Sequence, residues 1–178
     1  MTERNTNPPT PPFQRGARGD FPRILVLGLG NDILGDDAVG LLVARRLRAF
    51  LPDTVAVVES GGGGLDLLDL LEGYDRVLLL DAMLTGRHPA GTILEFSAAE
   101  LAKNEAPSPH YAGLPTVIAL ADSLGVKFPS DFRILAVEVA NPYEVVERLT
   151  TPVEAALPVL TARAQVIVEG WLALPSTG

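Results

Sequence analysis

The sequence predicts an α/β protein: a three-layer α/β/α sandwich with a mostly parallel five-stranded sheet. Two observations support this prediction. Continuous apolar runs, which are typical of strands buried on both faces of a parallel sheet, alternate with segments whose apolar residues recur at helical spacing. Their order and spacing are those of βαβ units, which place helices on both faces of a sheet. The pattern contains no internal repeat and indicates no second domain.

The first half of the pattern begins with the apolar run Ile24 to Leu29, which predicts a buried strand. Apolar residues at helical spacing then predict a helix from about Asp37 to Phe50. The other elements expected here are a strand at Thr54–Glu59, a glycine turn at Gly61–Gly64, a helix at Leu65–Leu71 ending at Gly73, and a strand at Arg76–Asp81.

The second half begins with a short strand, Thr92–Phe96. The connection before it holds glycine and proline and resembles a tight turn, so we expect this strand to be an antiparallel edge. Thr151 is expected to cap the last helix, with Glu154 three residues later in the capping-box pattern. This last helix has Pro152 in its first turn and is expected to run to about Leu172. The other elements expected here are a helix from Pro115 to Leu124, ended by Gly125, and a strand at Arg133–Ala140.

Length and composition favour one folded domain. The chain has 178 residues, of which 47% are hydrophobic and 20% charged, as in an ordinary globular protein. Residues 1–20 hold several prolines and almost no aliphatic side chains, so we expect a disordered tail there. Residues 21–178 are expected to form a single domain.

Charge and cysteine content exclude several functions. The formal net charge is −8, which argues against binding to nucleic acid or to anionic membranes. The chain has no cysteine, so disulfides, thiolate metal sites and cysteine nucleophiles are excluded. It shows neither a signal peptide nor an apolar run of the roughly 20 residues that cross a bilayer. We therefore expect a cytoplasmic protein, and we expect it to be a monomer.

The candidate site follows from the position of polar residues after the predicted strands. In open α/β sheets, ligands bind beyond the carboxyl ends of the strands. Asp37, Asp81 and His110 each follow a different predicted strand, so they are expected to meet on one rim. A nucleotide site is not expected there, because Ile33 occupies the third position of the dinucleotide fingerprint and no Gly-Lys-Ser/Thr loop is present.

One imidazole and two carboxylates, without sulfur, suit a divalent ion such as nickel, zinc or iron. Each residue alone also has an ordinary structural interpretation. Asp36 or Asp37 would cap a helix, Asp81 would hydrogen-bond the next loop, and His110 would be solvated. The metal-site hypothesis rests on all three coinciding at the edge where sites occur, with donor atoms within roughly 5 Å of one another. Two acids near strand ends, Glu59 and Glu138, are expected to support the rim.

The sequence resembles the nickel-iron hydrogenase maturation endopeptidases in four motifs that occur in the family's order. The resemblance covers nearly all of the predicted domain. Ala38 departs from it, because many members have glycine there. The motifs are Gly-Leu-Gly-Asn-Asp-Ile-Leu-Gly-Asp-Asp-Ala-Val-Gly at Gly28–Gly40, the block Gly63–Leu68, the strand Val77–Ala82, and Ser108-Pro109-His110 followed by Gly113-Leu114-Pro115.

This resemblance implies an endopeptidase that removes a C-terminal peptide from a hydrogenase large-subunit precursor after nickel insertion. It implies that Asp37, Asp81 and His110 are the metal-contacting and catalytic positions of an aspartic-type protease, with Asp36 as a supporting or general-base residue. Nickel is then expected to be carried by the precursor and held weakly, or not at all, by the free protein. Two alternatives stay open: a non-cleaving chaperone that senses the metal-loaded precursor, and a metal-dependent hydrolase of small molecules.

Overall fold

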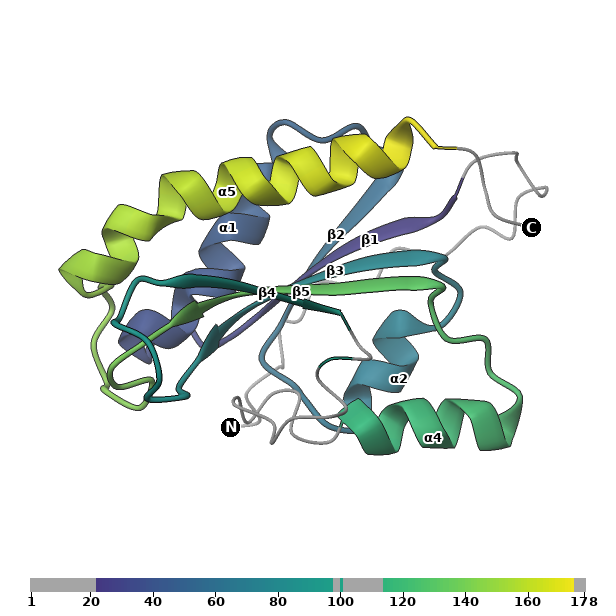
Figure 1. Ribbon diagram of the computed structural model, residues 1–178, viewed down its shortest axis with the longest axis horizontal. Coiled ribbons are helices and arrows are strands. Elements are labelled where there is room, and N and C mark those ends of the chain that lie inside the picture. The colour runs from purple at the N-terminus through teal and green to yellow at the C-terminus, as the bar shows by residue number, and fades with distance from the viewer. Residues whose placement is uncertain (1–21, 98–99, 101–113, 175–178) are drawn as a thin grey trace, which may run out of the picture.

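The computed structural model describes residues 22–97, 100 and 114–174. The expected tail at residues 1–20 lies outside this part of the chain, and so does His110. Within it, the expected α/β/α arrangement is confirmed: a five-stranded sheet lies between two layers of helices (Figure 1).

The sheet has the strand order β2-β1-β3-β5-β4. Four strands are parallel, and β4 pairs antiparallel with β5 at one edge, as expected from the short connection before it. The strands are β1 (Ile24–Leu29), β2 (Val55–Ser60), β3 (Arg76–Met83), β4 (Ile93–Ser97) and β5 (Asp131–Glu138).

The helices cover both faces of the sheet. On one face lie α1 (Val39–Arg48) and α5 (Thr151–Leu172), and on the other lie α2 (Asp66–Leu71) and α4 (Leu114–Leu124) (Figure 1). Successive strand residues face opposite sides, so β1 contributes to two separate cores. Val26 packs with the α1 and α5 side chains, whereas its neighbours Leu25 and Leu27 pack with those of α2.

Most boundaries differ by one or two residues from the sequence-based expectation, and three of the differences lie near the candidate site. Strand β3 continues past Asp81 to Met83, because its pairing with β5 continues to Met83 opposite Glu138. Strand β5 ends at Glu138, two residues earlier than expected. Asp37 belongs to a short 3-10 helix, η1 (Gly35–Ala38), and not to the regular helix α1 that follows.

The expected capping box at the start of α5 is wrong. The cap residue is Thr150, and its side chain makes no capping hydrogen bond to the helix. Its hydroxyl instead donates to Asp36, which is why it is not available to the helix backbone. Among the described residues, no helix is both long and apolar enough to cross a bilayer.

Candidate active site

Three glycines allow α1 to close tightly over the carboxyl ends of β1 and β3. A Cβ on Gly40 would overlap the carbonyl oxygens of Leu29, the last residue of β1, and of Leu80 in the second half of β3. A Cβ on Gly28 would lie 2.6 Å from the Gly40 carbonyl oxygen, and one on Gly30 would overlap that of Asp37. The start of α1 therefore rests directly on the two strand ends, without side chains in between.

This packing brings Asp37 and Asp81 to the same edge of the sheet. Asp81 directly follows Leu80, whose carbonyl lies under Gly40, and Asp37 lies three residues before Gly40 in η1. Both acids are buried: Asp37 is 4% exposed and Asp81 is 0% exposed. Both acids are therefore enclosed: Asp37 lies in the buried helix η1, and Asp81 lies between Leu79 and Met83 of β3, which pack in the core beneath α2.

The Asp81 carboxylate is partly oriented by its own strand. Its Oδ1 accepts a hydrogen bond from the Ala82 N–H at 2.8 Å. The third predicted ligand, His110, lies outside the described residues. In the described part of the chain, no group of three His, Cys, Asp or Glu side chains is arranged to hold a metal ion. The three-ligand site therefore stays a prediction, of which the structure describes the two carboxylates.

Asp36 has a clear structural partner. It is 1% exposed, and its Oδ1 accepts a hydrogen bond from the Thr150 N–H at 2.7 Å. Its Oδ2 accepts a second one from the Thr150 hydroxyl at 2.8 Å. Both carboxylate oxygens thus tie η1 to the start of α5. This geometry suits a residue that positions Asp37, and a general-base role for Asp36 stays a hypothesis.

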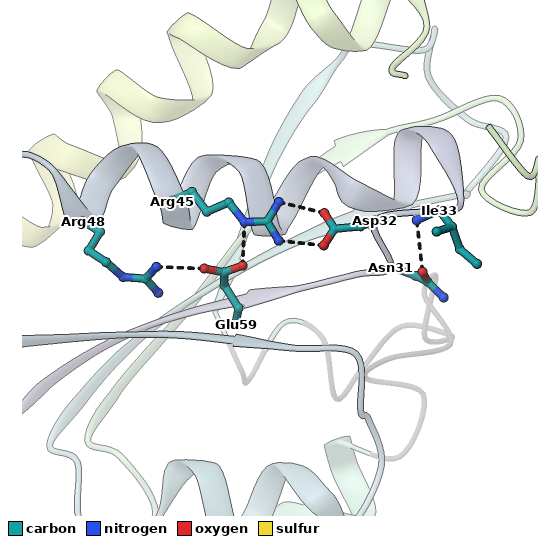
Figure 2. Close-up of polar contacts among 6 residues, drawn as sticks. All are labelled: Asn31, Asp32, Ile33, Arg45, Arg48 and Glu59. Atoms are coloured by element: carbon teal, nitrogen blue, oxygen red, sulfur yellow. Dashed lines mark hydrogen bonds and ion pairs between the residues drawn. The ribbon is translucent and has the colours of Figure 1, made fainter. Parts of the chain in front are cut away.

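A network of ion pairs orders the loop after β1 (Figure 2). Arg45 of α1 donates two hydrogen bonds to Asp32, both at 2.7 Å, and one at 2.7 Å to Glu59 at the end of β2. Arg48 donates a further one to Glu59 at 3.0 Å. The Arg45 hydrogen bonds hold the pKa of the Asp32 carboxyl below its usual value. Glu59 thus supports the edge, as expected, but the sequence analysis missed the role of Arg45.

Glu138 holds the loop after β3. It is 1% exposed and accepts hydrogen bonds from the N–H and hydroxyl of Thr85, at 2.8 and 2.7 Å, and from the Gly86 N–H at 2.7 Å. These three donors compensate the burial of its carboxylate. Glu138 therefore fixes the chain just beyond the strand that carries Asp81, which agrees with the expected supporting role.

The loops after β1 and β5 are joined by a parallel β-bridge that sequence reasoning did not find. Leu34 pairs with Val146. The Val146 N–H donates to the Ile33 carbonyl at 3.1 Å, and the Gly35 N–H donates to the Val146 carbonyl at 2.7 Å. A bridge between residues so distant in the sequence leaves no local signal. The bridge leads directly into η1, since Gly35 is the first residue of that helix.

Comparison with known proteins identifies the family of this chain. The sequence model of the HycI hydrogenase maturation protease family matches residues 41–166. The hydrogenase 2 maturation protease of Escherichia coli K12 is 33% identical over 138 residues, which cover 75% of this chain and 82% of that protein. The HupD hydrogenase expression/formation protein of Rhizobium leguminosarum is 29% identical over 84% of this chain and 76% of its own.

The same family appears among solved structures. The hydrogenase maturating endopeptidase HybD from E. coli superposes with a TM-score of 0.72 at 29% identity, over 83% of this chain and 93% of that one. The chain therefore belongs to the hydrogenase maturation proteases, a family of endopeptidases. The family match includes the position of Asp81 but begins after Asp37, so the role of Asp37 rests on the local geometry and on the motif around it.

Proposed function

We propose that this endopeptidase removes a C-terminal peptide from a nickel-loaded hydrogenase large-subunit precursor. Membership of the family supports the reaction class. The observation that carries the proposal is that Asp37 and Asp81, two nearly inaccessible carboxylates, lie in η1 and near the carboxyl end of β3, two elements that contact each other. Burying two carboxylates costs desolvation free energy. Acids buried at the carboxyl edge of a parallel sheet are therefore typical of a functional site.

In this proposal the nickel ion is cargo of the precursor and part of the substrate. Asp37 and Asp81, together with His110, supply oxygen and nitrogen donors of the kind that borderline divalent ions accept. The ion either marks the precursor as ready or also polarises the scissile carbonyl. The chain has no cysteine that could act as a nucleophile, and the candidate site offers carboxylates. We therefore propose an aspartic-type mechanism, in which a carboxylate accepts the proton of the attacking water.

The test is incubation with two forms of the same precursor, nickel-loaded and nickel-free, followed by intact-mass measurement. We expect the loaded precursor to lose a C-terminal peptide of defined mass and the nickel-free form to stay intact. A stable complex without product would replace the proposal by the metal-sensing chaperone. Absence of both complex and product would favour a small-molecule hydrolase.

We further propose that the protein works as a monomer in the cytoplasm, where precursor and enzyme would meet. Sedimentation of the free enzyme tests the first part. A mass corresponding to one chain of 18.8 kDa supports it, and a dimer contradicts it.

A further inference from the structure

Three large apolar side chains are exposed on the two loops that the Leu34–Val146 bridge joins. Ile33 is 51% exposed, Tyr143 is 65% exposed and Val145 is 77% exposed. Ile33 and Val145 each directly precede a residue of the bridge, so the parallel register places them beside each other on one side of it. We call Ile33, Tyr143 and Val145 the apolar strip.

The backbone beside this strip presents an open edge. Val146 directs both its N–H and its carbonyl toward the first loop, where they bond Ile33 and Gly35. Peptide groups alternate in direction along an extended segment, so those of Val145 face the opposite side. Within the described residues, neither the N–H nor the carbonyl of Val145 has a hydrogen-bond partner. An unpaired edge of this kind can accept an added extended strand.

The strip is only a few residues from the candidate active site along the first loop. Gly35, which binds the carbonyl of Val146, begins η1, and the next two residues are Asp36 and Asp37. A chain lying on the strip would therefore lead toward the buried carboxylates. A peptidase must hold its substrate extended near the reacting groups, and main-chain pairing does so with little dependence on side chains.

We propose that the apolar strip binds the C-terminal extension of the hydrogenase precursor as an added strand. The extension pairs with the N–H and carbonyl of Val145 and lays side chains on Val145, beyond which Ile33 extends the apolar surface. This inference rests on the proposed function. An extended chain is the occupant because the strip offers unpaired backbone groups next to apolar side chains; a docking helix, whose backbone groups are already paired, could use only the side chains.

The test measures binding of the nickel-loaded precursor to wild type, Val145→Asp and Ile33→Asp by interferometry. Val166→Asp is the matched control, because Val166 is 67% exposed on α5, about 20 Å along the helix from Thr151. We expect each strip variant to weaken binding about tenfold or more and the control to equal wild type. Val145→Ser serves as a milder variant if Val145→Asp melts at a lower temperature.

A second precursor, lacking only its C-terminal extension, identifies what the strip binds. We expect wild type and the strip variants to bind this shortened form equally. If the strip variants still bound the shortened precursor more weakly than wild type, by the same factor, the strip would contact the folded body of the precursor, which overturns the proposal. So would equal binding of the full precursor by all variants, no binding at all, or a dimer of this chain that Val145→Asp dissolves.

Cleavage assays run in parallel separate this inference from the proposed function. If wild type binds as expected but yields no product, the proposed function fails and the strip stands. If wild type cleaves the precursor and the strip variants cleave it with an unchanged KM, the strip fails and the function stands.

Discussion

The carboxylate of Asp36 accepts two hydrogen bonds from Thr150, a residue 114 positions away in the sequence, one from its N–H at 2.7 Å and one from its hydroxyl at 2.8 Å. This contact joins η1, which carries Asp37, to the first turn of the 22-residue helix α5. The local geometry at Asp37 thus depends on α5, a helix that packs beside α1 on the same face of the sheet.

We expect Asp36→Ala to lower the free energy of unfolding by about 1–3 kcal/mol, because it leaves the Thr150 N–H without its acceptor. Thr150→Val should cost about 1 kcal/mol, since it removes only the hydroxyl bond. Urea denaturation of both variants and the double variant measures this. Additive losses would contradict a direct coupling between the two residues.

The same two variants separate a positioning role of Asp36 from a general-base role. A positioning role predicts that kcat falls in both variants, in proportion to the loss of the contact. A general base predicts a loss of about a hundredfold or more in Asp36→Ala alone, with Thr150→Val close to wild type.

Gly40→Ala should destabilise the protein and impair cleavage. The added methyl would overlap the carbonyl oxygens of Leu29 and Leu80, so α1 must move away from the strand ends. We expect a cost of about 1–3 kcal/mol, despite the better helix propensity of alanine. Gly170→Ala in α5 is the control: nothing lies within 4 Å of its added methyl, so it should stabilise by roughly 0.5–1 kcal/mol. Thermal melts that move both variants in the same direction would contradict the tight packing at Gly40.

The role of the two acids is tested by near-isosteric changes. Asp37→Asn and Asp81→Asn should each lower kcat by about a hundredfold or more, and His110→Ala is predicted to do the same. Asparagine keeps the volume of these buried sites, so both Asn variants should stay folded. Leu79→Ala, at a fully buried position of β3, should instead cost about 2–5 kcal/mol through the cavity it leaves. If the Asn variants melted as low as Leu79→Ala, the two acids would be structural.

The Asp32–Arg45 pair should make a small, pH-dependent contribution to stability. Hydrogen bonds from Arg45 lower the pKa of Asp32 in the folded state. The stabilisation is therefore fully present above the unfolded value of about 3.9 and is lost as the pH falls through the lower folded value. The side chains of Arg45 and Asp32 are 40% and 53% exposed, so Asp32→Asn should cost only about 0.2–1 kcal/mol at pH 7. Urea titrations near pH 7 and pH 3 measure the difference. A cost that stays constant down to pH 3, or resists 1 M salt, would contradict this assignment.

Free protein should bind nickel weakly. Two carboxylates and one imidazole, without a thiolate, leave much of the coordination to the precursor. Calorimetry with Ni²⁺ should show little heat for the isolated protein, and the same for Asp81→Asn. Tight binding by wild type that Asp81→Asn abolishes would instead indicate a resident metal enzyme.

Local patterns were sufficient for most of the architecture. The apolar run Ile24–Leu29 forms a buried strand, as expected for a central parallel strand that is covered on both faces. The glycine- and proline-containing connection before β4 correctly indicated the antiparallel edge. Asp37 and Asp81 could be chosen as candidates because they follow strands whose carboxyl ends share one edge.

Other features depend on contacts between distant segments, which no local pattern encodes. Thr151 matched a capping box, yet the acceptor that engages its neighbour Thr150 comes from Asp36, at the opposite end of the domain sequence. The two acids were expected at a rim formed by strand ends, yet both are buried, Asp37 in η1 and Asp81 in a strand that is buried along its whole length. Residue type and spacing therefore determined which elements form and which side chains reach the site edge. Burial, hydrogen-bond partners and the Leu34–Val146 bridge were decided by the packing of those elements, because each requires two segments to meet in space.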